Sequence, residues 1–494
     1  MKYIIAIDQG TTSSRCIVYD QQANPIAVAQ QEFQQIFPQP GWVEHDAEEI
    51  WQTQAAVFRQ VLAQQHLNPQ DIAGIGITNQ RETTVIWERS TGKPIYNAIV
   101  WQDRRTANKC AQLKETGVEA MIKAKTGLLI DAYFSASKIC WILDHVDGAR
   151  DKAARGELAF GTIDSWLVWN LSNGELHITD VTNASRTLLF DIDRLQWDDE
   201  LLQLFNIPAS LLPEVKSSSE CYGVTRHPDV GTGIPIAAIA GDQQAALFGQ
   251  QCFKEGMAKC TYGTGSFLIM NTGSRKVASD NQLLTTIAWK IDDQVVYALE
   301  GSVFTSGAVI QWLRDGLHLF ENAAECETLA ASVADNGGVV FVPALTGLAA
   351  PHWDPHTRGS IFGITRGTTS GHITRAALEG ICFQVDELLS TMNADTGVPI
   401  SELRIDGGAT ANNLLIQFQA DISAIHIIRP SNLETTALGA AYLAGIATGF
   451  WTLAEICQKG KIEREFHGTI ASEEIEILKR KWLKAIDRSM HWAD

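Results

Sequence analysis

Three aspartates stand at the ends of apolar runs, each beside a glycine turn, and this pattern is suited to holding phosphate. Asp8 ends the run YIIAID, Asp242 follows AIAG, and Asp406 precedes Gly407 and Gly408 in LRIDGG. Glycine lets a backbone approach a phosphate or a base closely, and ligands of α/β proteins bind at the carboxyl ends of strands. An aspartate in such a place is more commonly a helix N-cap. Three of them in one chain nevertheless favour a shared nucleotide site.

The stretch AIDQGTTSSR, which contains Asp8, has the groups needed for a phosphate and its metal. Backbone N–H groups of a glycine and threonine turn form an anion-binding nest, and a neighbouring carboxylate holds Mg²⁺ directly or through water. Thr11, Thr12 and Arg15 complete this set. The chain has no G-x-x-x-x-G-K-[ST] motif and no convincing G-x-G-x-x-G after a strand, so neither a Walker P-loop nor a dinucleotide site is expected. Taken alone, the stretch is equally consistent with a surface turn.

A second stretch, MAKCTYGTGSFLIMNTG, repeats this pattern around Gly263, Thr264 and Gly265. Each stretch predicts two strands of a hairpin joined by a glycine turn, and each begins a domain-sized part of the chain. The repeat, which chance also produces in short turns, favours two related domains that face each other across a cleft. We place the boundary near GQQCFKEGM, with the domains at residues 1–249 and 250–494.

Strands and helices alternate around these turns, which predicts an α/β architecture with helices covering a sheet. The runs IAGIGITNQ and TTVIWE are expected strands, and a helix is expected after Asp242. HDAEEIWQTQAAVFRQVLAQQ predicts an amphipathic helix with Asp46 as its N-cap and Glu49 as a capping-box partner. SEEIEILKRKWLKAIDRSM predicts a terminal amphipathic helix that packs on the domain or on a partner subunit.

Length and composition exclude several classes of protein. With 494 residues, the chain is too long for one hydrophobic core. Its net charge of -18 argues against binding to nucleic acid or anionic lipid. The nine cysteines include no C-x-x-C pair, so neither a zinc framework nor a disulfide scaffold is expected. Asp8 interrupts the first apolar run and no uncharged apolar stretch approaches ~18 residues, so we expect a soluble cytoplasmic protein without an integral membrane segment.

Six motifs together resemble the FGGY family of carbohydrate kinases, and in particular its members that phosphorylate glycerol: DQGTTSSR, ITNQRETT, GDQQAALFGQ, TYGTGSF, TGLAAPHWDP and DGGATANN. The resemblance is collinear from Tyr3 to about Trp451. It implies two ribonuclease-H-like domains of the actin, sugar-kinase and chaperone superfamily, with an interdomain cleft. It also implies transfer of the γ-phosphate of ATP to glycerol with Mg²⁺ as cofactor, the first step of glycerol catabolism.

The resemblance also assigns residues to the two substrates. Asp8 would bind the metal, and Asp242 would be the general base as well as a glycerol contact. The other residues implied to hold glycerol are Arg81, Glu82, Tyr133 and Gln243, with Trp101 and Phe267 packing against its carbon chain. The residues implied to contact the nucleotide are Thr11, Thr12, Ser13, Arg15, Thr264, Gly307, Gln311, Gly408 and Asn412.

The residues assigned to the acceptor suit a small triol. Arg81 supplies only donors, the carboxylates of Glu82 and Asp242 only acceptors, and Gln243 both. A site that pairs every hydroxyl discriminates strongly against analogues that lack one. Two alternatives remain: another polyol or sugar kinase of the same family, with a different acceptor wall, and an actin-like or chaperone-like ATPase. The second alternative predicts slow ATP hydrolysis that glycerol does not affect.

Assembly and regulation follow from the resemblance alone. Members of the family are often dimers or tetramers, so a homo-oligomer is expected. Some members bind a sugar bisphosphate inhibitor on a basic, glycine-rich loop. The corresponding stretch here, VTRHPDVGTG at residues 224–233, lacks the basic cluster, so this form of regulation is not expected.

Overall fold

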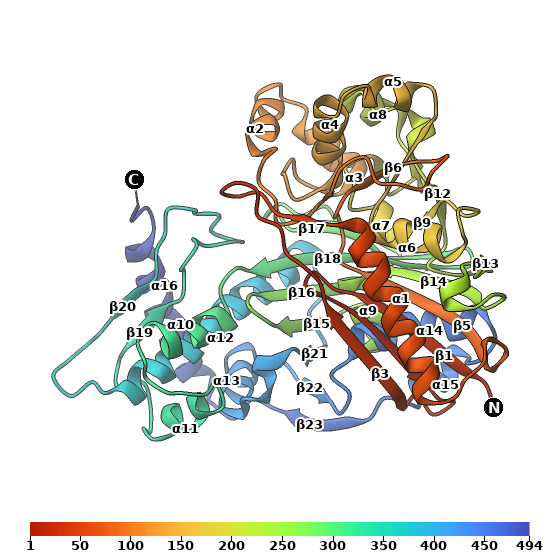
Figure 1. The fold of residues 1–494 in the computed structure, drawn as a ribbon. Helices are drawn as coiled ribbons and strands as arrows, with labels where there is room; N and C mark the ends of the chain where they lie inside the picture. The colour runs from red at the N-terminus through yellow and green to blue at the C-terminus, as the bar shows by residue number, and fades with distance from the viewer. Residues whose placement is uncertain (494) are drawn as a thin grey trace.

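A computed structural model describes residues 1–493, and a mixed sheet of 13 strands runs through both halves of the chain (Figure 1). The order of its strands is β23-β22-β21-β15-β16-β18-β17-β13-β14-β5-β1-β2-β3. Their bounds are β1 Tyr3–Gln9, β2 Ser13–Tyr19, β3 Pro25–Glu32, β5 Ile72–Asn79, β13 Ser219–Val224, β14 Pro235–Gly241, β15 Met257–Tyr262, β16 Ser266–Gly273, β17 Leu284–Ile291, β18 Gln294–Val303, β21 Glu402–Asp406, β22 Ile427–Pro430 and β23 Ile462–Phe466. The strands expected from the glycine-turn motifs are all present in this sheet.

The register of the N-terminal strands brings the predicted site residues to one edge. β1 and β2 form the first predicted hairpin, β1 is parallel to β5, and β5 is parallel to β14. Parallel strands end at a common edge. Asp8 therefore lies beside Thr78, and Gly241 lies beside Asn79. The loop that follows β5 and the aspartate that follows β14 consequently emerge next to Asp8.

The C-terminal strands repeat this arrangement. β15 and β16 form the second predicted hairpin, and β15 is parallel to β21, with Thr261 beside Asp406. In each half, the first hairpin strand thus has an antiparallel neighbour on one side and a parallel neighbour on the other. The two parts of the sheet meet where Ser219 of β13 pairs with Ile291 of β17.

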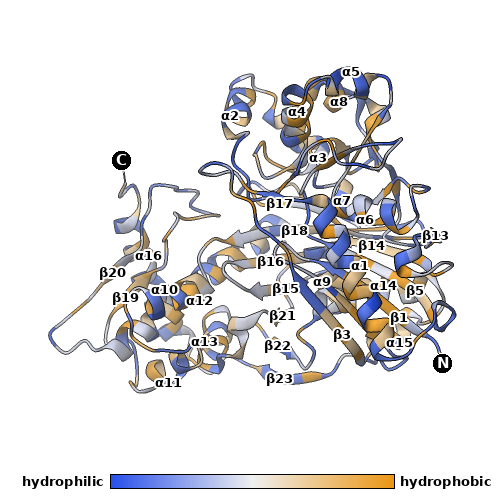
Figure 2. Cartoon of the chain, in the orientation of Figure 1, coloured by the Kyte–Doolittle hydropathy of each residue, from blue (hydrophilic) through white to orange (hydrophobic). Residues whose placement is uncertain are grey.

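Two helices, α9 (Asp242–Gly249) and α14 (Thr435–Ala447), pack against each other between the halves. α14 follows β22 in the C-terminal half but lies on β1, β5 and β14 of the N-terminal half. Glycine makes this close packing possible, because a Cβ atom at Gly439 would lie 1.8 Å from the carbonyl oxygen of Ala245. Figure 2 shows hydrophobic ribbon where β1, β5 and α14 come together. The halves are therefore interlocked and not joined by one simple linker.

Helix α1 (Ala47–Gln64) confirms one expectation and corrects another. Asp46 is its N-cap, and its side chain accepts hydrogen bonds from the backbone N–H groups of Glu48 and Glu49. The expected capping box does not form, because the Glu49 carboxylate accepts a hydrogen bond from the backbone N–H of Gln34 instead, at 3.2 Å. The preceding strand region thus competes successfully for the Glu49 side chain.

A mainly helical region lies beside the N-terminal sheet, at the top of Figure 1. Its apolar side chains form their own core cluster. Its helices are α2 Ala107–Glu115, α3 Glu119–Thr126, α4 Ser135–His145, α5 Ala149–Ala154 and α8 Asp199–Phe205. Two further helices, α6 Ile163–Leu171 and α7 Val181–Ala184, connect this region to the sheet.

The strands outside the large sheet form five short two-stranded sheets. They are β4 Glu44–His45 with β7 Ala98–Ile99, β6 Val85–Glu88 with β8 Leu158–Gly161, β9 Ile178–Asp180 with β12 Glu214–Lys216, β10 Phe190–Asp191 with β11 Gln196–Trp197, and β19 Val340–Val342 with β20 Ser360–Phe362.

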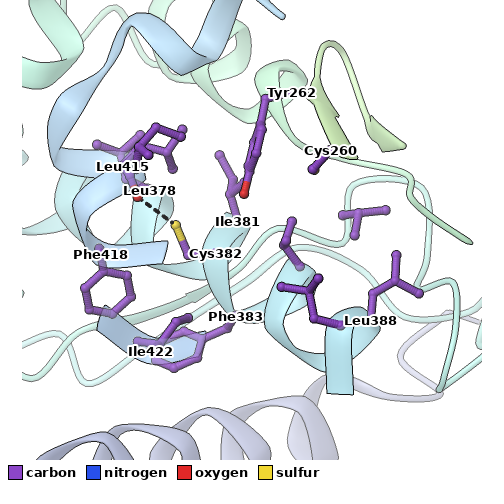
Figure 3. Close-up of a cluster of buried hydrophobic side chains, with 14 of the residues drawn as sticks. Cys260, Tyr262, Leu378, Ile381, Cys382, Phe383, Leu388, Leu415, Phe418 and Ile422 are labelled. Atoms are coloured by element: carbon purple, nitrogen blue, oxygen red, sulfur yellow. Dashed lines mark hydrogen bonds between the residues drawn. The ribbon is translucent and has the colours of Figure 1, made fainter. Parts of the chain in front are cut away.

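The C-terminal half has a large core cluster that includes much of the long helix α12 (Ser370–Thr396), and Figure 3 shows part of this cluster. Cys382 of α12 lies against α13 (Asn413–Ser423), and its thiol donates to the carbonyl oxygen of Leu415 at 3.3 Å. The predicted terminal helix is α16 (Ser472–Ser489), and its Trp482 stacks on Phe383 of α12 at 5.1 Å. The remaining helices are α10 Gly307–Asp315, α11 Glu325–Ala331 and α15 Leu453–Cys457. Across residues 1–493, we find no helix with the length and apolar character needed to cross a membrane.

Candidate active site

Arg81 and Glu82 follow β5 and are almost completely buried, at 3% and 1% exposure. Glu82 has φ +59°, a left-handed conformation that is uncommon for a residue with a side chain. Its carbonyl oxygen accepts hydrogen bonds from the hydroxyls of Thr84 and Ser135, which hold this backbone in place. Strained backbone of this kind is typical of functional sites. Arg81 and Glu82 are therefore not an exposed ion pair on the protein surface.

Arg81 is the hub of a buried polar network. Its Nη1 and Nη2 atoms donate to both carboxylate oxygens of Glu300, at 2.5 and 3.0 Å. Its Nε atom lies 3.2 Å from Oδ1 of Asp242, and its Nη2 atom donates to the hydroxyl of Tyr133 at 3.4 Å. Every nitrogen of the guanidinium group thus has a partner. The structure therefore brings together Arg81, Tyr133 and Asp242, which the sequence assigned to one acceptor site.

Glu82 joins the same network through Arg186. Its Oε1 atom accepts a hydrogen bond from Nε of Arg186 at 2.6 Å, and Nη2 of Arg186 donates to Glu300 at 3.0 Å. Burial alone would raise the pKa of Glu300, but the charges of Arg186 and Arg81 lower it from 4.5 to about 2. Glu300 therefore remains a carboxylate between two arginines.

Sequence reasoning missed Glu300 and Arg186. Neither residue lies in a glycine-turn motif, and Glu300 reaches the network from β18, in the other half of the chain. A charged residue within an otherwise apolar strand was the one available signal. In VVYALEGSVF, Glu300 stands on a strand with buried neighbours on both sides.

Trp101 connects the acceptor residues to the first glycine turn. Its Nε1 atom donates to the hydroxyl of Thr11 at 3.0 Å, and its ring packs edge-to-face on Tyr133 with centroids 5.7 Å apart. The aromatic pair thus stands between the Arg81 network and the residues assigned to phosphate. This placement agrees with a site in which an acceptor lies next to a nucleotide phosphate.

Phe267 lies near the network without a direct bond to it. On the antiparallel pair of β16 and β18, Phe267 is opposite Ser302 and Ile269 is opposite Glu300. Opposed residues and residues two apart along a strand share one face of a sheet. Phe267 and Glu300 are consequently on the same face, one pleat apart.

Gln243 is held by a buried lysine that the sequence did not single out. Nζ of Lys259, on β15, donates to Oε1 of Gln243 and to the hydroxyl of Thr261. Lys259 is fully buried, and this burial lowers the pKa of its ammonium group. The bond crosses from the C-terminal strand β15 to the first turn of α9.

Asp242 is the accessible carboxylate of this group. Its side chain is 34% exposed, whereas those of Glu82 and Glu300 are 1% and 4% exposed. It is the first residue of α9, and its Oδ1 atom accepts a hydrogen bond from the backbone N–H of Gln243 at 2.7 Å. A carboxylate that is fixed on one side by Arg81 and open on the other can accept a proton from a bound hydroxyl.

The first glycine turn carries Asp8 and the residues assigned to phosphate. The backbone N–H of Gly10 donates to the carbonyl oxygen of Ser13 at 3.0 Å, which closes the turn. Desolvation raises the pKa of Asp8 from 3.8 to about 7; Arg15 opposes this shift, and the carboxylates of Asp242 and Glu434 add to it. Carboxylate oxygens are ligands that Mg²⁺ prefers. The carboxylate of Asp8, with those of Asp242 and Glu434 in its surroundings, therefore fits the expected metal.

Arg15 is held across the two halves in this structure. Its Nη1 atom pairs with Glu434, the residue before α14, and its Nη2 atom donates to Gln30 at 2.6 Å. Gln30 also donates to the hydroxyl of Ser13 at 3.0 Å, while Thr12 is exposed. The phosphate-side residues thus lie around one turn, and Arg15 has an acidic partner that a phosphate group could replace.

The second glycine turn places Thr264 against the start of α10. The backbone N–H groups of Ser306 and Gly307 donate to the carbonyl oxygens of Thr264 and Gly263, each at 2.9 Å. A Cβ atom at Gly307 would lie 2.5 Å from the carbonyl oxygen of Gly263, so this contact requires glycine. Gln311 is one turn further along α10 and is exposed. The turn that carries Thr264 therefore packs on the start of α10, where Gly307 lies. Gln311 is on the same helix, and its side chain has no hydrogen bond in the described part of the chain.

Gly408 and Asn412 lie in the turn after β21. Gly407 has φ +93°, and a Cβ atom there would lie 2.5 Å from the carbonyl oxygen of Tyr262, whereas one at Gly408 would meet nothing within 4 Å. The open space at Gly408 is available to a ligand. Asn412 is the N-cap of α13, and its Oδ1 atom accepts from the backbone N–H of Leu415 at 2.9 Å. This turn is thus packed on the strand that leads into the second hairpin turn.

Comparisons with known proteins agree with this geometry. The chain matches both family models of the FGGY family of carbohydrate kinases: residues 3–249 match the N-terminal domain, and residues 258–448 match the C-terminal domain. Glycerol kinases of Burkholderia multivorans and Paraburkholderia phytofirmans are each 59% identical over 494 residues, covering 100% of this chain and 99% of the relative. The crystal structure of Plasmodium falciparum glycerol kinase with ADP is 39% identical and superposes with a TM-score of 0.95, covering 99% of this chain and 98% of that one. A gluconate kinase from Lactobacillus acidophilus, at 22% identity and a TM-score of 0.88, shares the fold. The expected two-domain α/β fold class is therefore confirmed.

Proposed function

Because the chain belongs to the FGGY family of carbohydrate kinases, we propose that it transfers the γ-phosphate of ATP to a terminal hydroxyl of glycerol, giving sn-glycerol 3-phosphate and ADP. Its full-length relatives are glycerol kinases at 59% identity. The observation that carries the proposal is the buried network around Arg81, which leaves Asp242 as its accessible carboxylate beside the first glycine turn. Such a network suits a small polar acceptor next to a phosphate.

Glycerol recognition depends on the polar groups that this network orients. Glu82, Tyr133 and Gln243 would pair with hydroxyls, while Trp101 and Phe267 would face the carbon chain. The 3.4 Å contact between Arg81 and Tyr133 is the longest of the hydrogen bonds to the guanidinium group, so a glycerol hydroxyl can replace it at least cost. A site of this kind discriminates against acceptors that leave a buried partner unpaired.

Asp242 is the proposed general base. Its carboxylate would accept the proton of the terminal hydroxyl as that oxygen attacks the γ-phosphorus. The ion pair with Arg81 at 3.2 Å orients the carboxylate, and its 34% exposure leaves it open to the acceptor. Phosphoryl transfer otherwise depends mainly on positioning and on neutralising charge.

The two glycine turns are proposed to hold the phosphates from opposite halves. Thr11, Thr12, Ser13 and Arg15 belong to the first turn, and Thr264 belongs to the second. Gly307, Gln311, Gly408 and Asn412 would lie along the rest of the nucleotide. Asp8 would hold Mg²⁺, which when bound neutralises phosphate charge. Residues 1–249 and 250–494 are the proposed domains on the two sides of this site.

Two properties of the whole enzyme are also proposed. A cytoplasmic location is supported by the nine cysteines, which are all free thiols. A homo-oligomer is expected from the family resemblance, and sedimentation of the purified protein would measure its size.

A coupled assay of ADP release with and without glycerol tests the function. We expect ADP release that depends on glycerol, and a fall in kcat of about 10²–10⁴-fold in Asp242→Asn, the usual contribution of a general base. The variant should keep the parent's melting temperature and its affinity for ATP, because Asp242 is partly exposed and its side-chain volume is retained. A matched control is Asp487→Asn, an exposed aspartate on α16, which should retain parent turnover.

Three results would count against the proposal. Near-parent turnover in a folded Asp242→Asn that binds ATP would exclude the general-base role. A pentulose that is a better acceptor than glycerol would favour another sugar kinase. Slow ATP hydrolysis that glycerol leaves unchanged would favour an ATPase of the actin-like or chaperone-like class.

A further inference from the structure

A pocket lies between the halves, and its lining residues are not those of the proposed active site. It has a volume of about 280 Å³ and is lined by residues of the turn between β2 and β3, the end of α9, helix α14, and strands β21, β22 and β23. Figure 1 shows these elements, which come from both ends of the chain. None of the residues assigned to glycerol, nucleotide or metal lines it. The pocket is therefore a separate place where a ligand would touch both halves.

The charged side chains that line this pocket are basic, although the chain as a whole is acidic. Arg404, Lys459 and Lys461 line it, and no aspartate or glutamate of the described residues does. The chain as a whole has a net charge of -18, so a pocket lined by three basic side chains and no carboxylate differs from the rest of the protein. A pocket lined in this way attracts anions from solution.

Two of these cations retain donors that a ligand can use. Arg404 donates from Nε to Glu402 at 2.6 Å, which leaves its terminal nitrogens without hydrogen bonds among the described residues. Nζ of Lys461 has a 3.5 Å contact with Oδ1 of Asn24, longer than a normal hydrogen bond. Arg404 belongs to β21, while Asn24 belongs to the turn between β2 and β3. An anion held by Arg404 and Lys461 would therefore sit beside the turn between β2 and β3, which lines the same pocket.

A buried amide without a complete set of partners also lines the pocket. Gln250 is 1% exposed, and its Nε2 atom donates to Asp406 at 3.0 Å. Its Oε1 atom has no hydrogen-bond partner in the part of the chain that the structure describes. An unpaired buried acceptor is costly, and a ligand hydroxyl would satisfy it. Leu438 and Tyr442 of α14 provide an apolar wall.

We infer that this pocket binds a small phosphorylated polyol, with its phosphate on Arg404 and Lys461 and a hydroxyl donating to Gln250. The volume is below that of a typical drug-sized site, which agrees with a compact ligand. The cations select the phosphate, and the orphaned amide oxygen selects a ligand that also carries a donor. Inorganic phosphate alone would satisfy the first requirement but not the second.

A ligand bound in this pocket would affect the proposed nucleotide-binding residues through Asp406. One carboxylate oxygen of Asp406 accepts hydrogen bonds from Gln250 and from the hydroxyl of Thr435, which also lines the pocket. Gly408, two residues after Asp406, is a proposed nucleotide contact. A ligand that reorders Gln250 therefore changes nucleotide affinity, and nucleotide changes the affinity for the ligand by the same factor. The pocket is thus an effector site.

Calorimetric titration tests the site on the full-length protein. Glycerol 3-phosphate is the probe, and the protein is first saturated with glycerol, ADP and Mg²⁺ so that the acceptor site is blocked. We expect binding to the parent, and an affinity reduced about tenfold in Lys461→Gln and in Arg404→Gln, since each loses a charged donor to the phosphate. Lys481→Gln, an exposed substitution on α16 outside the pocket, is the matched control and should bind like the parent.

Parallel titrations separate the parts of the inference. Inorganic phosphate should bind more weakly than glycerol 3-phosphate, because it brings no polyol. Asp242→Asn should bind the probe like the parent even if the proposed general-base role fails, so the two proposals can fail separately. No binding to the parent, or equal affinity in Lys461→Gln, Arg404→Gln and Lys481→Gln, would overturn the site. Binding that leaves the affinity for ADP unchanged would overturn its effector role.

Discussion

Glu300 is the residue on which the buried network depends. It is 3% exposed and accepts hydrogen bonds from both Arg81 and Arg186. Removing the charge of one member of such a network leaves the others buried and unpaired, which costs far more than an exposed ion pair contributes. Among the described residues, the hydrogen bonds of the Glu300 side chain are with the two arginines and not with Asp242, so we interpret it as a positioning residue that holds Arg81 in place.

Glu300→Gln should therefore weaken glycerol binding more than it slows turnover. Gln keeps one acceptor oxygen for Arg81 but loses the charge and the second oxygen, so the orientation of Arg81 is less well defined. We expect the KM for glycerol to rise about tenfold, with a smaller change in kcat and in the KM for ATP. Steady-state kinetics with glycerol and ATP varied separately measure this split. Glu476→Gln, at an exposed residue of α16, is the control. An equal rise in the KM for glycerol and the KM for ATP would contradict the positioning role.

The depressed pKa of Glu300 also predicts a contribution to acid stability. Its pKa is about 2 in the folded protein and 4.5 without the network, so its carboxylate stabilises the fold above pH 4.5. This contribution is lost as the pH falls from 4.5 towards 2, because protonation then requires breaking the pairs with Arg81 and Arg186. It amounts to roughly 3 kcal/mol of unfolding free energy. Urea unfolding at a series of pH values between 4.5 and 2 measures this contribution. The unfolding free energy should fall less steeply with decreasing pH in Glu300→Gln than in the parent. An equally steep fall in the two proteins would contradict the prediction.

At the scale of elements, the two glycine hairpins are equivalent parts of the two halves. β1 and β15 each have an antiparallel hairpin partner and a parallel strand beside them. The helices between the halves are fitted to each other by glycine. A Cβ atom at Gly249 would lie 2.0 Å from the carbonyl oxygen of Thr435, and one at Gly76 would lie 2.0 Å from that of Ala440. α9, α14 and β5 therefore touch through backbone atoms.

Gly439→Ala should separate α9 from α14. Its new methyl group would lie 1.8 Å from the carbonyl oxygen of Ala245, and neither backbone can yield without disturbing the other helix. We expect a loss of about 3 kcal/mol of unfolding free energy, the upper part of the range for overpacked cores. Thermal unfolding checks this. Gly367→Ala, in an exposed loop with its nearest atom 4.0 Å away, should change stability little, and equal melting temperatures for the two variants would contradict the interpretation.

At the scale of the molecule, the halves are interlocked by helix exchange and by ion pairs. α14 belongs to the C-terminal half by sequence but packs on the N-terminal sheet. Arg15 pairs with Glu434 at the start of α14, and Arg81 pairs with Glu300 of β18. Two arginines of one half are thus held by carboxylates of the other. Changes at the interface between the halves consequently reach both proposed substrate sites.

Glu434→Gln should increase the affinity for ATP and ADP. In the present structure Glu434 forms an ion pair with the guanidinium group of Arg15, which is a proposed phosphate contact. The negative charge of Glu434 also repels phosphate. The glutamate is 44% exposed, so the pair is a weak one and the expected gain is modest, up to about fivefold. Fluorescence titration with ADP measures it, with Glu476→Gln as control. Weaker binding in Glu434→Gln would show that Glu434 supports the nucleotide site instead of competing with it.

Local chemistry in the sequence was sufficient to predict the two glycine hairpins and several of the helices. Glycine turns between apolar runs predicted the hairpins β1–β2 and β15–β16, because alternating burial and turn propensity act over a few residues. The same reasoning placed Asp46 as a helix cap and Asp242 at the start of a helix. The capping-box prediction for Glu49 was wrong because the backbone N–H of Gln34, in the segment that follows β3, offered a competing donor. The motifs also identified the family.

What the tertiary structure alone decided is how charges far apart in the chain meet. Arg81 and Glu300 are 219 residues apart, and Arg15 and Glu434 are 419 residues apart. No local rule relates such residues, since their contact depends on the order of strands in the sheet and on the crossing of α9 and α14. The buried network, the lysine behind Gln243 and the cationic pocket all arise from that long-range packing. The sequence by itself therefore determined which groups are present at each turn, and the fold determined which of them are buried, paired or left accessible.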